Sequence, residues 1–418
     1  MSTNKSAFSS FIIILLLIFT VRSFAQDGSY SPYSYFRFGD PVDKQPVPFA
    51  AMGHLDFMAD TIHYNPNNPA SVARLKYVNY AFAFSSNTFQ SKTNNDFSKQ
   101  TAIIIPYVYL GFPVGKKAGF GTGFRPYATS NFLIKIDSDD EQIAKTGEGG
   151  MNEFFATAGF RVYKGLSAGL GFHYYFGNKI YRIINHRNYV YTTTRQIDDA
   201  FYSGKGFDFS LMYHQNFNRY YFQAFAAYQP DTYLQSENLS TLELIDDSYN
   251  IERVSNKTVL RHDTVSQLLP ARFSGGLGAG VNGKWFFGLQ YEQQDWTEYQ
   301  NDFFTNASVN YGKAYEFRLG GYWIPDNRIH VKYWKRITYK AGFFSGQTGL
   351  ILNNKPLDYF GTTFGMDLPV KHFLSHASID FEYWKRGTTE NGLILENLFK
   401  LKISLSLNDK WFIKRKIN

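Results

Sequence analysis

The stretch that decides the fold is FKLKISLSL, residues Phe399–Leu407, in which a large apolar side chain alternates with lysine or serine. A β-strand places successive side chains on opposite faces, so a period of two gives one apolar face and one polar face. The same alternation occurs in Val78–Phe84, Leu166–Phe176 and Phe207–His214. These repeats predict an all-β structure from about residue 76 onward.

Strands are expected to begin at about fourteen places, an even number that is typical of bacterial transmembrane barrels. Short turns, such as 215–219, alternate with longer polar loops, such as 230–270. This alternation predicts short turns in the periplasm and long loops outside the cell, with both termini periplasmic. Connection 325–336 is longer, and only its place in the alternation assigns it to the periplasm. The expected strand starts are residues 77, 101, 117, 150, 166, 206, 220, 271, 284, 314, 337, 358, 375 and 396.

The composition fits a barrel with an apolar outer wall and a wet interior. Aromatic residues make up 19% of the 418 residues, yet the mean hydropathy is -0.32. A soluble all-β protein also alternates and is the alternative here, but large residues on nearly every apolar face favour a membrane. Because lipid satisfies no open sheet edge, we expect a closed, transmembrane antiparallel β-barrel of about fourteen strands over residues 76–409. Its expected location is the outer membrane of a Gram-negative cell.

The first 25 residues have the pattern of a secretory signal peptide. Lys5 precedes the apolar run Phe11–Val21, and Ala25 stands at the expected cleavage position. The run is shorter than the roughly 20 residues of a stable membrane helix, although an uncleaved anchor is the alternative. The chain has no cysteine, which argues against a lipoprotein, thiol catalysis and cysteine-based zinc sites.

Residues 26–75 do not alternate, and we expect them to form a hatch that plugs the barrel lumen. The alternative is a floppy periplasmic extension. Asn68 and Pro69 suit the N-cap and the first position of a short helix. After the barrel, residues 410–418 are expected to form a basic periplasmic tail. The apolar residues that favour a hatch over an extension are Phe36, Phe38, Phe49, Met52, Leu55, Phe57 and Met58.

Motifs at both ends of the mature chain resemble the FadL-like family of long-chain fatty-acid transporters, in the form common in Bacteroidota. The opening departs from the family's usual pattern at Tyr35 and Arg37, where arginine and glycine are common. The motifs are Ser31-Pro32-Tyr33-Ser34 with Gly39-Asp40, then Asn65-Pro66-Asn67-Asn68-Pro69-Ala70-Ser71, and the ending Leu407–Lys416. The candidate ligand or hatch residues within them are Arg37, Phe38, Gly39, Asp40, Asn65, Pro66, Asn68 and Pro69.

The resemblance implies a barrel of about fourteen strands with an N-terminal hatch, and passive uptake of hydrophobic, fatty-acid-like small molecules. The cargo would enter an outer groove, pass the hatch and leave sideways through the wall. One relative instead serves as a shuttle in the type IX secretion system, so the fold does not fix the cargo. The alternative function is a non-transporting barrel partner of a secretion or envelope-assembly complex, with loop 230–270 as the docking segment.

Charged residues on the inward register of the late strands form a second candidate site. If the last two strands pair, Asp380 and Glu382 face Lys400 and Lys402, and each opposite-charge pair stabilises by about 0.2–1 kcal/mol. A ladder that stiffens the wall or clamps the hatch is the first interpretation, and carboxylate binding or polar permeation is the alternative. The ladder residues are Glu292, Glu316, Arg318, Lys340, Asp380, Glu382, Lys400 and Lys402.

Several smaller patterns have structural interpretations. The glycines of 119–123 and 275–280 lack the helix that a dinucleotide site needs, so we expect them to make room for a hatch or ligand. His372 and His376 bracket a tight turn rather than a helical face, which argues against a metal site. The tryptophans near strand ends suit the aromatic girdles of a membrane barrel, namely Trp285, Trp296, Trp323, Trp384 and Trp411.

The net charge of +8 comes without an interior basic run interleaved with aromatics, which argues against nucleic-acid binding. No HExxH, GxSxG or nucleophile–base arrangement occurs, so we expect no enzyme activity, no cofactor and no metal. The expected partners are outer-membrane lipid and lipopolysaccharide, and a hydrophobic small molecule that the sequence does not name.

Overall fold

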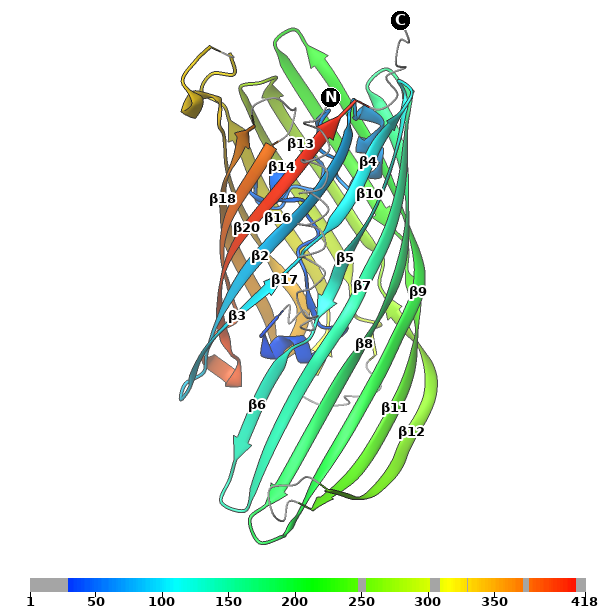
Figure 1. Cartoon of the computed structure of the whole chain (residues 1–418), viewed down its shortest axis with the longest axis vertical. Helices are drawn as coiled ribbons and strands as arrows, with labels where there is room; N and C mark the ends of the chain where they lie inside the picture. Colours follow the sequence, from blue (N-terminus) through cyan, green and yellow to red (C-terminus); the bar gives the residue numbers. More distant parts are fainter. Residues whose placement is uncertain (1–28, 247–252, 301–308, 329, 371–375, 411–418) are drawn as a thin grey trace, which may run out of the picture.

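The computed structural model describes residues 29–246, 253–300, 309–328, 330–370 and 376–410. The predictions for the signal peptide, for His372 and for the tail from Trp411 onward lie outside these residues. The described chain forms a tall antiparallel barrel that encloses its N-terminal segment (Figure 1). Within the same residues, no helix combines the length and the apolar character needed to cross a membrane.

The barrel is closed and has fourteen antiparallel strands, which confirms the predicted fold. Interruptions divide some barrel strands in two, so that β3 continues as β4, β5 as β6, β10 as β11, β12 as β13 and β15 as β16. Closure occurs where β2 pairs with β20, from Val78 opposite Asp409 to Lys92 opposite Leu395. In chain order the strands are β2 (Val78–Lys92), β3 (Phe97–Ile104), β4 (Val108–Val114), β5 (Ala118–Thr129), β6 (Phe132–Asp137), β7 (Glu141–Tyr163), β8 (Leu166–Arg187), β9 (Thr192–Phe217), β10 (Tyr220–Gln229), β11 (Thr232–Asp246), β12 (Arg253–Leu269), β13 (Arg272–Val281), β14 (Trp285–Asp295), β15 (Val309–Tyr311), β16 (Lys313–Trp323), β17 (Thr338–Leu352), β18 (Lys355–Pro369), β19 (His376–Arg386) and β20 (Leu395–Asp409).

The two ends of the barrel differ in their connections. We call the end where β2 begins and β20 finishes the short-turn end, and the opposite end the long-loop end. Connection 325–336 lies at the short-turn end, between β16 and β17, as the alternation predicts. Strands that begin at this end start within one residue of the prediction, at 78, 118, 166, 220, 285, 338 and 376.

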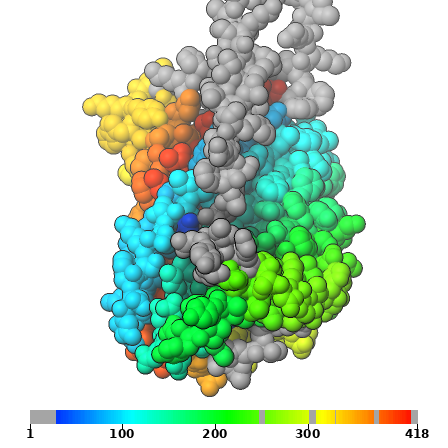
Figure 2. All heavy atoms as spheres, turned by 60° about the horizontal axis from the view of Figure 1, so that its bottom comes forward, coloured from blue at the N-terminus to red at the C-terminus, as the bar shows by residue number. Residues whose placement is uncertain are grey.

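Strands that begin at the long-loop end start earlier than predicted. The prediction that 230–270 is a loop is wrong, because most of it forms the hairpin of β11 and β12. β11 also pairs with the outer part of β9, so this hairpin continues the barrel wall. This segment is rich in polar residues, which makes it look like a loop in the sequence. Strand pairing nevertheless continues there, beyond the part of the wall whose outer face is uniformly apolar. From the long-loop end, the β2–β3 hairpin in cyan and the β8–β9 and β11–β12 hairpins in green lie on different sides (Figure 2).

The outer face of the barrel is apolar and the inner face is polar. On β9, Phe207, Phe209 and Leu211 are exposed, whereas Asp208 and Ser210 are buried inside. This inversion of a soluble protein's pattern is that of a membrane-spanning barrel.

The tryptophans divide between the two faces. Trp285 and Trp323 lie opposite each other on β14 and β16 and are exposed, as girdle residues should be. The girdle prediction is wrong for Trp296 and Trp384, which line a cavity inside the barrel. Closeness to a strand end does not determine the face, because one step of register reverses it.

The N-terminal segment fills the lumen and is drawn in blue in Figure 1. It contains η1 (Pro32–Tyr35), β1 (Asp40–Pro41), α2 (Val47–Ala50) and η2 (Pro69–Arg74). Asn68 precedes η2 and Pro69 opens it, as expected. The Asn68 side chain does not cap this helix, because its Nδ2 donates to the Phe57 carbonyl at 3.2 Å.

Some of the predicted glycines make room for this segment, namely Gly119, Gly121 and Gly276, whereas a Cβ at Gly275 would meet only wall residues. A Cβ at Gly121 would lie 2.3 Å from the Tyr64 ring, and one at Gly119 would lie 2.2 Å from the Val72 carbonyl oxygen. A side chain at either position would therefore push the hatch away from β5.

Candidate functional site: a lumen cavity beside a seam in the wall

The strap, residues 37–45, carries the hatch from η1 to α2 along the inner wall. Its β1 pairs with β5, with Asp40 opposite Thr129. Arg37 and Gly39 both have left-handed backbone angles, with φ of 50° and 121°. A Cβ at Gly39 would lie 2.6 Å from the Thr129 carbonyl oxygen, so this crossing requires glycine.

The first side chains of the strap attach it to opposite parts of the wall. Arg37 donates from Nη2 to the Thr348 carbonyl at 2.7 Å and lies 4.5 Å from the centroid of the Trp296 ring. Phe38 is buried and packs edge-on against Tyr202. Both contacts fix the position of the strap inside the barrel.

Asp40 ends in a buried ionic cluster with the last two strands. Its Oδ1 accepts from Arg386 Nη1 at 2.6 Å, and Arg386 also pairs with Glu396 at 2.7 Å. Ser31 donates to Glu396 at 2.6 Å and accepts from Arg386 at 2.8 Å. Every charge in this cluster therefore has an opposite partner, as burial requires.

Asp43 joins a second cluster, which contains part of the predicted charge ladder. The side chains of Lys400 and Lys402 approach Asp43 at 2.7 and 2.8 Å and approach Glu382 at 3.1 and 2.7 Å. His54 of the hatch lies 3.1 Å from Glu382. The structure places Glu382 opposite Lys400 and Asp380 opposite Lys402, and the ladder contacts the hatch directly.

Asp43, His54 and Glu382 could in principle supply ligands to a metal ion, since their donor atoms lie within 4.8 Å of one another. Two ammonium groups, from Lys400 and Lys402, already neutralise these carboxylates. A divalent cation would have to displace them against charge repulsion, so this arrangement fits a clamp better than a metal centre.

Asp56 forms a third cluster with three more residues of the predicted ladder. Arg318 pairs with Asp56 and reaches Glu316 at 2.9 Å and Glu292 at 3.4 Å. Asn67 donates to Asp56 at 2.7 Å. The remaining ladder residue, Lys340, lies apart, where it pairs with Asp367 and donates to a hatch carbonyl.

A fourth cluster was not predicted from the sequence. Arg125 pairs with Glu153 at 2.6 Å, and His173 bridges Glu153 at 2.5 Å and Asp208 at 2.7 Å. Arg125 also donates to the Lys44 carbonyl at 3.0 Å, which attaches the strap to this side of the barrel. The register of the strands could have predicted this cluster, because its four residues fall on the inward face of β5, β7, β8 and β9.

The later motif residues organise the hatch from within. Asn65 donates from Nδ2 to the carbonyls of Asp56 and Met58, at 2.5 and 3.1 Å. Asn65, Pro66, Asn68 and Pro69 are all buried and do not line the main cavity. They differ in this from Arg37, Phe38, Gly39 and Asp40, which do line it.

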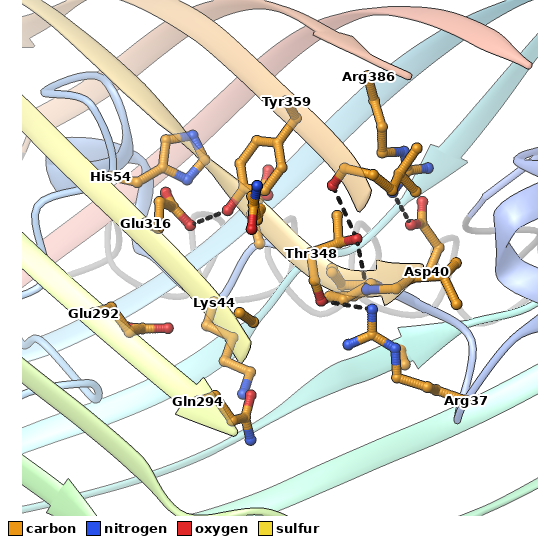
Figure 3. A pocket seen from close by; sticks show the side chains of 18 of the residues that line it. Arg37, Asp40, Lys44, His54, Glu292, Gln294, Glu316, Thr348, Tyr359 and Arg386 are labelled. Atoms are coloured by element: carbon orange, nitrogen blue, oxygen red, sulfur yellow. Dashed lines mark hydrogen bonds and ion pairs between the residues drawn. The ribbon is translucent and has the colours of Figure 1, made fainter. Parts of the chain in front are cut away.

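The main cavity has a volume of about 240 Å³ and lies between the strap and strands β13 to β19. Trp296, Phe344, Tyr359 and Trp384 are among its aromatic lining residues. Figure 3 shows the Glu316 carboxylate directed at the Tyr359 hydroxyl, a hydrogen bond of 2.7 Å. Most charged groups of the cavity are thus paired with one another. The aromatic side chains therefore provide the surface that a bound molecule would contact.

Lys44, like Arg37, lines the cavity without an ion pair to any described carboxylate. Figure 3 shows its side chain beside Gln294, on the same side of the cavity as Glu292. Its Nζ lies 3.9 Å from the centroid of the Tyr127 ring. Burial, reinforced by the charge of Arg272, lowers the pKa of Lys44 to about 7. The cavity therefore contains one amine whose charge is easily lost or gained.

The barrel wall has a seam next to the strap. The ladder between β4 and β5 ends with Val108 opposite Phe124. Beyond that point β3 pairs with β2 and β6 pairs with β7, but within the described residues no ladder joins β3 to β6 (Figure 1). Pro106 lies between β3 and β4 and Pro126 lies in β5, and proline has no N–H to leave unpaired at such an edge.

A second, smaller cavity of about 20 Å³ lies at this seam, lined by Ile104, Pro106 and Thr129. It shares Asp40–Asp43 and Trp384 with the main cavity. The strap therefore separates the lumen cavity from the seam.

Comparisons with known proteins agree with this architecture. The CymD monoaromatic hydrocarbon channel superposes with a TM-score of 0.57 at 12% identity, covering 90% of this chain and 99% of that one. The Pseudomonas putida toluene transporter TodX gives 0.58 at 13% identity, with 89% and 99% covered. A Pseudomonas aeruginosa FadL homologue gives 0.55 at 11% identity, with 89% and 98% covered. At these identities the likeness is one of fold.

No curated protein matches the chain. A family model described as BamG matches residues 8–418, which is nearly the whole sequence. The chain therefore belongs to the BamG family.

Proposed function

We propose that this protein is an outer-membrane channel through which hydrophobic small molecules pass from the lumen cavity, past the strap, to the seam in the wall. The observation that carries the proposal is the position of the strap, with a cavity on each side of Asp40–Asp43 and an unpaired wall beside it. In this proposal the short-turn end faces the periplasm, since short turns of such barrels usually do.

The lining of the main cavity supports a hydrophobic guest. Its buried arginines Arg318 and Arg386 are paired with carboxylates, so their hydrogen-bond donors are already occupied and bind a polar solute poorly. An apolar cavity of about 150 Å³ admits benzene, so about 240 Å³ has room for a monoaromatic molecule or a bent alkyl chain. Fatty-acid-like cargo is the finer proposal, in which Lys44 would meet the carboxylate.

Gating by the hatch follows from the same geometry. The main cavity and the seam are separated by only a short stretch of backbone, which Asp40 and Asp43 fasten to β19 and β20. We infer that passage requires a local shift of the strap while η2 and the rest of the hatch stay in place.

The test is uptake by liposomes that contain the purified protein, with labelled toluene and labelled oleate as separate cargoes. Ala314 lines the cavity, and Ala314→Phe should reduce uptake by filling it. Ala226 is exposed on the lipid-facing side of β10, so Ala226→Phe is the matched control and should not change uptake. Uptake no faster than in protein-free liposomes would refute the proposal.

The second candidate function is a non-transporting barrel partner of an envelope-assembly or secretion complex. It is favoured by the four ionic clusters, which hold the hatch firmly, and by the long wall of β7, β8, β9 and the β11–β12 hairpin. Ser236 pairs with Val265, so residues 237–264 can be replaced by a two-residue turn. A barrel shortened in this way that keeps uptake but loses its cellular role would support this candidate.

A further inference from the structure

A cleft at the short-turn end has no part in the proposed transport path. It is open, has a volume of about 700 Å³, and is formed by the end of η2, the β4–β5 and β7–β8 turns, and β9. Four cations line it, Arg74, Lys117, Arg161 and Lys164, and none of its lining residues is acidic. The cleft therefore carries cations without the neighbouring carboxylates that accompany cations in the lumen.

The four cations differ from those of the lumen in their partners. Arg318 and Arg386 each meet more than one carboxylate. Within the part of the chain that the structure describes, the four cleft cations form no ion pair. The Nε of Arg74 is buried without a hydrogen-bond partner. A buried donor of this kind needs a partner such as an ordered water or an ion, and an anion in the cleft would supply one.

Arg74 and Arg161 repel each other across the cleft. Burial and the charge of Arg161 lower the pKa of Arg74 to about 10. Asp60 is the acidic residue that acts on Arg74, but His63 occupies it, with its backbone N–H at 2.6 Å and its Nδ1 at 2.6 Å. An anion between the two guanidinium groups would relieve this repulsion.

Backbone hydrogen bonds hold the walls of the cleft together. The Arg161 N–H donates to the Lys117 carbonyl at 2.7 Å, and the His214 N–H donates to the Gly165 carbonyl at 2.8 Å. The His214 ring lies between Gln223 at 3.2 Å and Asn216 at 3.3 Å, an arrangement that a neutral imidazole satisfies. Lys117, Arg161 and Lys164 are thus presented by connected turns, and Arg74 reaches the cleft from η2.

We propose that this cleft binds a phosphate group, either free phosphate or the headgroup of a phospholipid. Guanidinium groups match the oxygens of phosphate in geometry. The four positive charges of two arginines and two lysines also suit a doubly charged phosphate better than a singly charged carboxylate. Val162 and Tyr163 are exposed beside the cations, which provides apolar surface for the chains of a lipid. The inference is independent of what the lumen transports.

In the experiment, inorganic phosphate is titrated into the intact, lipid-free protein in detergent, and the heat of binding is measured by calorimetry. Lys117→Gln/Lys164→Gln changes two exposed turn residues and should weaken phosphate binding by about tenfold or more. Lys284→Gln/Lys332→Gln removes two exposed lysines elsewhere at the same end and should leave binding unchanged. Absence of binding by the unmodified protein, or equal loss in both double variants, would overturn the proposal.

The source of the phosphate is decided by repeating the titration in nanodiscs of phosphatidylglycerol. If a lipid headgroup is the ligand, phosphate binding should disappear in these discs and return in detergent. If free phosphate is the ligand, its affinity should be the same in both. Arg74→Gln/Arg161→Gln provides a second test within the cleft, with its fold checked by the heat-dependent gel shift of an intact barrel.

Discussion

The Asp43 carboxylate of the hatch lies 2.7 Å from the ammonium group of Lys400, in the strand that closes the barrel against β2. Burial and the nearby Glu382 raise the pKa of Asp43, but Lys400 and Lys402 outweigh them and bring it to about 2. A carboxylate with such a pKa is ionised throughout the physiological range. The strap is therefore fastened by charge at the place where the proposed path requires it to move.

Asp43→Asn should loosen the strap without unfolding the barrel. Removing one partner from a buried ion cluster costs about 3–5 kcal/mol, because the remaining charges are left unbalanced. Hydrogen exchange of residues 37–58 should speed up, while exchange of β7 to β9 should stay slow. Asp96→Asn, at an exposed turn residue, is the matched control. Unchanged exchange in the strap would show that the cluster does not hold it.

Acid should release the hatch in a defined pH window. The charge of His63 and its hydrogen bonds lower the pKa of Asp60 to about 2 against the effect of burial, so Asp60 resembles Asp43. Both pKa values are depressed from 3.8. Their stabilisation is therefore complete above about pH 4 and is lost as the pH falls toward 2. Proteolysis of the hatch measured between pH 6 and 2 should rise in that window, and Asp43→Asn should flatten the rise.

Gly39→Ala should destabilise the strap more than a glycine substitution at an ordinary turn. The Cβ would meet the Thr129 carbonyl at 2.6 Å in addition to the left-handed backbone strain. Gly115 also has a positive φ, of 66°, but a Cβ there meets nothing within 4 Å. Gly115→Ala should therefore cost about 1–2 kcal/mol from strain alone. Equal melting temperatures for the two variants would contradict the close crossing of β1 and β5.

Lys44 should make the stability of the hatch depend on pH near neutrality. Its pKa falls from 10.5 to about 7 on folding, so between these values the unfolded chain holds a proton that the folded chain has released. Stability from this group therefore rises with pH above 7. Lys44→Met should be the more stable protein at pH 7, and its advantage should shrink by pH 9. A constant difference between the two proteins would show that Lys44 does not titrate there.

The sequence predicted the strands of the barrel wall better than the contacts of the hatch inside it. Alternation in segments such as 399–407 locates the strands, because one face meets lipid and the other meets polar groups. The outer limits of the strands were less predictable, since β11 and β12 mix polar residues with exposed apolar ones such as Leu239 and Val259, and the hydropathy no longer alternates regularly. The seam was likewise hidden, because among the described residues it is marked by the absence of a ladder between β3 and β6 rather than by a residue pattern.

The hatch clusters illustrate a second limit. Asp380 and Glu382 could be matched to Lys400 and Lys402, because neighbouring strands fix their register. Asp43 could not be assigned to the same cluster, since the hatch has no periodic register relative to the wall. Long-range pairs such as Asp40 with Arg386 depend on how the hatch folds inside the barrel.

The most direct measurement is cargo uptake with the seam covalently closed. Ile104 and Thr129 both line the small cavity at the seam, and the chain has no native cysteine, so Ile104→Cys/Thr129→Cys can be bridged with a bifunctional thiol reagent. Thr362→Cys/Tyr383→Cys, across the paired strands β18 and β19, is the control. Bridging should abolish uptake of toluene in the seam variant and leave the control unaffected. Undiminished uptake through the bridged seam would contradict lateral passage.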